Sequence, residues 1–130
     1  MDGPSAELAY LFTHAVYREV AYQLQLPSDR ARLHGLALEI LEAAHAADLG
    51  AIAWQLAEHA RLASENPTRE DKLREARFLR MVMDTSRRRA AQEIGLRCAD
   101  RLMDLGVLEG VDLFDVCQQR AQILSDMGRP

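Results

Sequence analysis

Apolar residues recur at three- and four-residue spacing along nearly the whole chain, the pattern that buries one face of an α-helix. Short segments rich in Pro, Gly, Ser, Thr and Asn separate these stretches and interrupt helices. The pattern predicts an all-α fold of about six helices, at approximately residues 4–25, 28–47, 52–65, 68–84, 87–105 and 111–127.

Several helix ends are indicated by local chemistry. Ser28 follows a proline and is predicted to be the N-cap of the second helix. Thr68, with an aspartate three residues later, predicts a capping box at the start of the fourth helix. The Thr85-Ser86 pair predicts a break before the fifth helix, and Gly106 predicts the end of that helix.

The first predicted helix is apolar on a broad face, so we expect it to be buried on more than one side. Its segment Tyr10–Thr13 contains β-favouring residues and could be extended in a longer protein. The connections are short, so successive helices should be neighbours that pack mostly antiparallel, as hairpins. Two arrangements remain open at this point, a closed bundle and an open stack of repeats.

Two of the later helices favour the stack. The sixth resembles a tetratricopeptide (TPR) helix in its small, large and turn-glycine positions, and the fifth resembles the second helix of a TPR. The implied repeat is roughly 40 residues, longer than the ~34 residues of an ordinary TPR. Arg120 departs from the pattern, because the position before the small residue is normally apolar. The matching residues are Ala91, Ile94, Cys98, Ala121, Leu124 and Gly128.

The N-terminal part resembles a more specific signature, F-x-H-x-x-x-R-x-x-A-Y followed by R-x-x-L-H, which follows the ATPase module in bacterial STAND-type regulators. In that family the segment links the nucleotide-binding module to a TPR-like sensor. The resemblance implies a single helical-repeat domain over residues 1–130, with a linker hairpin and following helix at 10–66 and TPR-like repeats at 67–130. The chain has no G-x-x-x-x-G-K-[ST] loop, so we expect a fragment of a larger protein. The residues that carry the resemblance are Phe12, His14, Arg18, Ala21, Tyr22, Arg30, Arg32, Leu33, His34 and Ala37.

The composition of the chain limits which partners it is expected to bind and where in the cell it is expected to be found. The 130 residues suit one domain, with 48% apolar and 28% charged residues. Acidic residues exceed basic ones by 20 to 16, so there is no general attraction to nucleic acid or anionic membranes. No apolar run approaches the ~20 residues that span a bilayer, and the N-terminus lacks the pattern of a signal peptide. We expect a cytoplasmic protein.

The sequence predicts no catalytic, cofactor or metal site. The four histidines show no HExxH or comparable spacing, and a zinc site needs three or four converging ligands. His14 and Arg18 are one helical turn apart, and we expect them to fix the first hairpin against the second. Cys98 and Cys117 lie within helical patterns without a CxxC motif, and are predicted to be buried, reduced and structural.

Nucleic-acid binding is the alternative function. The basic cluster at residues 87–89 is isolated and has no interleaved aromatic residues, so a solvated helix start is favoured over phosphate contacts. A helix-turn-helix interpretation of the first hairpin is also disfavoured, because its second helix lacks Asn, Gln or Lys at exposed early positions, and only Arg30 and Arg32 support it. Trp54 is the single tryptophan and a candidate anchor for a protein partner.

The sixth helix offers a further candidate interaction surface. In the TPR register its partner helix would lie beyond Pro130. We therefore expect four apolar residues to be partly uncovered and to favour a homodimer, namely Leu113, Val116, Ala121 and Leu124. Alternatively this helix caps the stack, with a polar outer side made of Asp112, Asp115, Gln118, Gln119, Gln122 and Asp126. The sequence thus predicts a non-catalytic module for protein–protein or intramolecular contact, and the resemblance to STAND-type regulators implies that it belongs to a bacterial signalling or transcriptional regulator.

Overall fold

The computed structural model describes residues 4–24 and 26–128, and every regular element in these ranges is helical. The α-helices are α1 (Pro4–Leu24), α2 (Pro27–Ala44), α3 (Ala53–Leu62), α4 (Arg69–Arg88), α5 (Gln92–Leu105) and α6 (Gly110–Asp126). A short 3₁₀ helix, η1 (Leu49–Ile52), leads into α3. The predicted all-α class is therefore confirmed.

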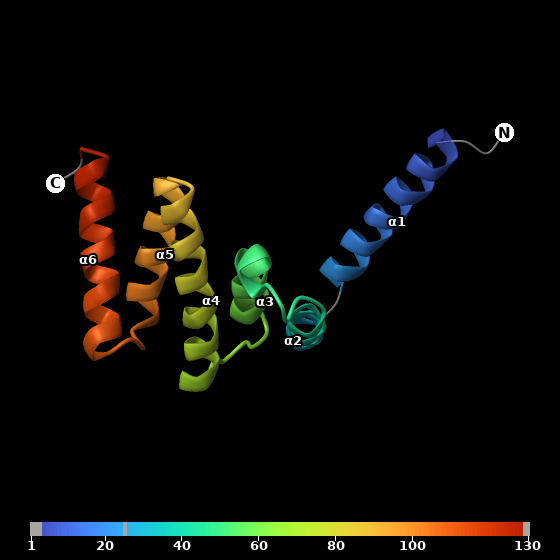
Figure 1. The fold of residues 1–130 in the computed structure, drawn as a ribbon. Coiled ribbons are helices and arrows are strands. Elements are labelled where there is room, and N and C mark those ends of the chain that lie inside the picture. Colours follow the sequence, from blue (N-terminus) through green and yellow to red (C-terminus); the bar gives the residue numbers. More distant parts are fainter. Residues whose placement is uncertain (1–3, 25, 129–130) are drawn as a thin grey trace.

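Helices α2 to α6 form a row in which each helix packs against the next in the chain (Figure 1). The starts of α3 and α5 are roughly 40 residues apart, as are those of α4 and α6. This spacing agrees with the repeat length expected from the sequence. The arrangement is the helical-repeat-like stack rather than a closed bundle.

The core runs along the middle of this row, chiefly between α3, α4 and α5. Its largest side chains include Phe78 of α4, and α2 and α6 each contribute one fully buried large residue, Leu38 and Val116. Small residues such as Ala57 and Ala99 let the helices approach closely. Packing of apolar side chains between successive helices supplies the main stabilisation of such a stack.

Ion pairs join every second helix along one side of the row. Arg74 of α4 donates to Glu42 of α2 at 2.7 Å, and Arg80 of α4 donates to Asp112 of α6 at 2.6 Å. Because α2, α4 and α6 are connected in this way, they share one side of the stack. Asp112 and Asp115 of α6 therefore lie on the side of this helix that is near Arg80 of α4.

An ion pair between α4 and α5 has its carboxylate buried within the stack. Arg101 of α5 donates two hydrogen bonds to the Glu75 carboxylate of α4, at 2.7 and 3.0 Å. Glu75 is buried, and the bidentate geometry satisfies both of its carboxylate oxygens. The hydrogen bond to Glu75 raises the pKa of Arg101, so the guanidinium stays charged.

Helix α1 departs from the predicted hairpin. It projects away from the row and does not pack extensively against α2 (Figure 1). Val16, Tyr17 and Val20 are exposed, so the prediction that this helix is buried on more than one side is wrong. Tyr10–Thr13 is helical and not extended. Tight packing requires a facing apolar surface, and the described residues of α2 to α6 place none against this part of α1.

The predicted helix ends hold in part. Thr68 forms the capping box with Asp71, and Gly106 ends α5 in the left-handed conformation at φ 64°. Ser28 is not an N-cap, because α2 already begins at Pro27, a residue suited to the first helical turn.

The predicted break at Thr85-Ser86 is also wrong. Both hydroxyls donate to carbonyl oxygens one turn earlier in α4, so the helix accommodates them and continues to Arg88. The chain turns instead at Ala90, which has φ 54°.

Candidate functional site

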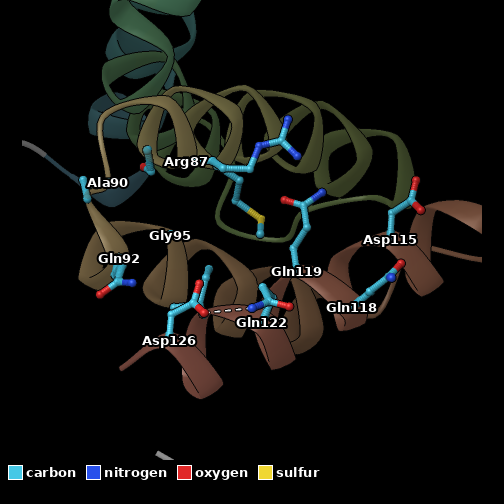
Figure 2. Close-up of a pocket in the computed structure, with 13 residues that line it drawn as sticks. Arg87, Ala90, Gln92, Gly95, Asp115, Gln118, Gln119, Gln122 and Asp126 are labelled. Atoms are coloured by element: carbon cyan, nitrogen blue, oxygen red, sulfur yellow. Dashed lines mark hydrogen bonds between the residues drawn. The ribbon is translucent and has the colours of Figure 1, made fainter. Parts of the chain in front are cut away.

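A groove of about 610 Å³ lies between the end of α4, the start of α5 and one side of α6 (Figure 2). It is larger than the hollow of about 560 Å³ between α1, α2 and α3. Its lining comprises Met83, Ser86, Arg87, Ala90, Ala91, Gln92, Gly95, Asp115, Gln118, Gln119, Gln122, Ile123 and Asp126.

The floor of the groove is apolar and closely packed. Met83 and Gly95 are buried, and the Ser86 hydroxyl donates to the carbonyl of Val82 at 2.7 Å. A Cβ atom at Gly95 would lie 3.1 Å from Cδ1 of Ile123, so glycine allows α6 to approach α5. The floor therefore offers an apolar surface with its hydroxyl already satisfied.

Carboxamides dominate the walls of the groove. Gln118, Gln119 and Gln122 come from α6 and Gln92 from α5, and Figure 2 shows Gln119 extending from α6 toward α4. Gln122 donates a hydrogen bond to Asp126 at 2.8 Å. A carboxamide carries both donors and an acceptor, the complement that a peptide bond presents. The walls can therefore pair with a polypeptide backbone.

The charged groups of the groove are one arginine and two aspartates. Arg87 comes from α4, where it is 3.8 Å from Asp84, and Asp115 of α6 is 3.8 Å from Arg80. The Arg87–Asp84 pair is exposed and the Arg80–Asp115 pair is partly exposed, and both are long, so they leave the side chains able to contact a ligand. The groove has no strong excess of either charge.

The polar side of α6 borders the groove. A polar outer side of α6 was one of the two alternatives predicted from the sequence, and Gln118, Gln122 and Asp126 are indeed exposed, whereas Asp115 and Gln119 are partly buried. All five line the groove together with residues of α4 and α5. Their spacing in the sequence identifies one face of a helix. It does not identify which neighbouring helix lies opposite that face.

A second cluster connects α1, α2 and α3 through hydrogen bonds. The Tyr22 hydroxyl is 2.7 Å from Nε2 of His34, and Nδ1 of His34 is 2.9 Å from Nδ1 of His59. A hollow of about 560 Å³ lies beside these three side chains. We call this chain of hydrogen bonds the Tyr-His-His relay.

The surroundings of the relay disfavour a charge on His34. Burial lowers the pKa of His34, and His59 and Arg61 lower it further, whereas Glu58 opposes them. Neutral imidazole is thus the favoured form of His34 at neutral pH.

The predicted interaction residues lie on different parts of the molecule. Arg30 places its guanidinium 5.4 Å from the centre of the Tyr22 ring, and Arg32 is exposed on α2. Trp54 is partly exposed on α3 and borders hollows shared with Arg97 of α5. The structure does not bring these residues together with those of α6.

On α6 the prediction of a partly uncovered apolar side holds only in part. Leu113 and Leu124 are partly exposed, but Val116 is fully buried in the core. Val116 is covered because it points into the contact with α5. The large apolar residues that α6 exposes are Val111 and Phe114.

The structure also places the two cysteines, the basic cluster and His14. Cys98 is buried, as predicted, and burial raises the pKa of its thiol to about 11, whereas Cys117 is exposed, contrary to prediction. The basic cluster at residues 87–89 lies at the end of α4 and not at a helix start. His14 stacks on Tyr10 of the same helix.

No group of three or more His, Cys, Asp or Glu side chains among the described residues is arranged to hold a metal ion. None of the described helices is long and apolar enough to cross a membrane.

Comparison of the chain with protein-family models, with curated proteins and with solved structures finds no match.

Proposed function

We propose that this protein is a non-catalytic interaction module that binds an extended polypeptide segment in the groove between α4, α5 and α6. The observation that carries the proposal is a set of four glutamine carboxamides above an apolar floor. The ligand would be a segment of a partner protein or of another domain of the same protein.

The chemistry of the groove suits an extended backbone. A strand-like segment exposes unpaired N–H and C=O groups along its length, and carboxamides can donate to one and accept from the other. The apolar floor at Met83, Gly95 and Ile123 would receive one small or apolar side chain of the segment. Main-chain contacts provide affinity, and this floor provides side-chain selection.

The test is selection of peptides from a random library on the immobilised protein, followed by affinity measurement with the selected peptides. A Gln119→Ala/Gln122→Ala variant should bind them at least tenfold more weakly, because two hydrogen bonds of ~1 kcal/mol each are lost. Gln55→Ala is the matched control, since Gln55 is exposed on α3 outside the groove.

Two results would contradict the proposal. One is unchanged affinity of the selected peptides for the double variant. The other is preferential binding of a DNA or RNA probe with a steep salt dependence, which would favour the nucleic-acid alternative.

The role in a bacterial signalling regulator is part of the same proposal. It is supported by the resemblance of the N-terminal segment to the region after the ATPase module of STAND-type regulators. In such a protein the stack would receive a segment of another domain or an external partner. Expression together with the flanking parts of the natural gene product would test whether a neighbouring domain competes with the selected peptides.

A further inference from the structure

The Tyr-His-His relay contains two imidazoles in direct contact. Nδ1 of His34 and Nδ1 of His59 are 2.9 Å apart, so one of them must carry a proton and donate to the other. Two neutral rings meet this requirement, and so do two rings that share one additional proton. Two imidazolium rings do not, because both Nδ1 atoms would then carry a proton and a positive charge.

A hydrogen bond of the relay also attaches α1 to the stack. The bond from Tyr22 to His34 is 2.7 Å long, and the guanidinium of Arg30 lies over the Tyr22 ring. Helix α1 otherwise projects from the row without extensive packing (Figure 1). A displacement of the His34 ring would therefore weaken the attachment of α1.

From these contacts we infer that the Tyr-His-His relay is a pH-sensitive joint, closed at neutral pH and opened by protonation of both histidines. Opening separates His34 from His59 and loosens α1 from the stack. This inference does not depend on peptide binding in the groove, which lies at the other end of the row.

Charged groups around the joint come from all three helices. Arg18 and Glu19 of α1 line the adjoining hollow, and Arg30 of α2 lies against Tyr22. On α3, Glu58 is engaged by Arg61 through two hydrogen bonds. Glu65 borders a neighbouring hollow that also reaches His34. Burial and the neighbouring His59 disfavour a charge on His34 more than any other group, Glu58 favours that charge, and Arg61 disfavours it.

The direction of the pH dependence follows from the lowered pKa of His34. The unfolded or opened chain binds a proton more readily than the closed joint, so closure becomes less favourable as pH falls. The stability that the closed joint contributes is fully present above pH 6.5, the ordinary pKa of histidine. It is lost as the pH falls from there through the lowered pKa of His34.

The experiment measures the distance between α1 and α6 with two spin labels at about pH 7.5 and about pH 5. One label is attached to Thr13→Cys on the exposed side of α1 and the other to the native Cys117, which is exposed. Cys98 is buried and remains unlabelled. We expect one distance population at neutral pH and loss of most of it at acidic pH.

His59→Gln is the decisive variant, because glutamine can hydrogen-bond to His34 but does not titrate in this range. It should keep the neutral-pH distance at both pH values. His45→Gln is the control, since His45 is exposed and outside the relay, and it should respond like the unmodified protein. An acid response of His59→Gln equal to that of the unmodified protein, or no response of the unmodified protein, would overturn the inference.

Should His59→Gln fail to fold, histidine NMR titration of the natural sequence provides the test. We expect the titration of His34 to lie below the ordinary value of 6.5 and to be coupled to that of a second imidazole. An uncoupled titration of His34 at or above that value would overturn the inference.

Discussion

Cys98 of α5 lies against the central helices of the stack and has only 1% of its surface exposed. A thiol behaves here as a small apolar group, and its raised pKa keeps it protonated. The sequence match to a small position of a TPR helix predicted this burial. For stability, a small and uncharged side chain is therefore what this position requires, and the thiol itself is less important.

Substitutions at Cys98 separate these effects. Cys98→Arg should unfold the protein or lower its free energy of unfolding by several kcal/mol (~3–5), because a large cation is buried without a partner. Cys98→Ala removes one sulfur atom and should cost about 1 kcal/mol. Urea denaturation monitored by circular dichroism measures both values. Small, equal effects would show that this face of α5 is exposed in solution.

At the scale of single elements, α4 illustrates how local and tertiary interactions combine. Its start depends on a local capping box, in which the Asp71 N–H donates to the Thr68 hydroxyl and the Thr68 N–H donates to the Asp71 carboxylate. Its middle depends on burial against α3 and α5, including Phe78 and Leu79. That burial outweighs the weak helix preference of Thr85 and Ser86, so α4 continues past them.

The two predicted N-caps should therefore respond differently to mutation. Thr68→Ala should lower the free energy of unfolding by about 1 kcal/mol, because it leaves a backbone donor of the first turn without its partner. Ser28→Ala should change it by less than ~0.5 kcal/mol, because Ser28 lies inside α2 and makes no capping hydrogen bond. Thermal and chemical denaturation of the pair provide the comparison. Equal losses would contradict the assignment of the helix starts.

At the scale of the whole molecule, the row α2–α6 is a continuous packed unit, whereas α1 presents uncovered apolar residues. Val16, Tyr17 and Val20 share the side of α1 opposite Ala15, Glu19 and Tyr22, which border the hollow next to α2. At the other end of the row, Val111 and Phe114 of α6 are also exposed. Clustered apolar surface of this kind favours association with another polypeptide.

We expect the isolated protein to self-associate as its concentration rises. Each large apolar side chain that becomes covered contributes roughly 1.5–3 kcal/mol. Light scattering across a range of concentrations should show a rise in mean mass, reduced in a Tyr17→Ser/Val20→Ser variant. Phe114→Ser, tested alone, determines whether α6 also takes part.

Two outcomes would contradict this expectation. A strict monomer at high concentration would show that the exposed residues of α1 and α6 do not mediate contact between copies. Association unchanged in all of these variants would place the contact elsewhere on the molecule.

The sequence alone determined the features that depend on neighbouring residues. The period of apolar residues predicted an all-α chain, and the fourth helix start at Thr68 and the end at Gly106 were both placed correctly. Short connections predicted that successive helices pack together, which holds from α2 to α6. These features follow from backbone geometry and hydrogen bonds within a few residues.

Only the tertiary structure decided which surfaces face each other. It placed polar residues of α6 beside a groove that α4 and α5 also line, and it brought together His34 and His59, which are far apart in the sequence. It also left α1 projecting, although its apolar pattern resembles that of a buried helix. Periodicity shows that a helix has an apolar or polar face, but the rotation and crossing of packed helices depend on how side chains from distant segments fit together.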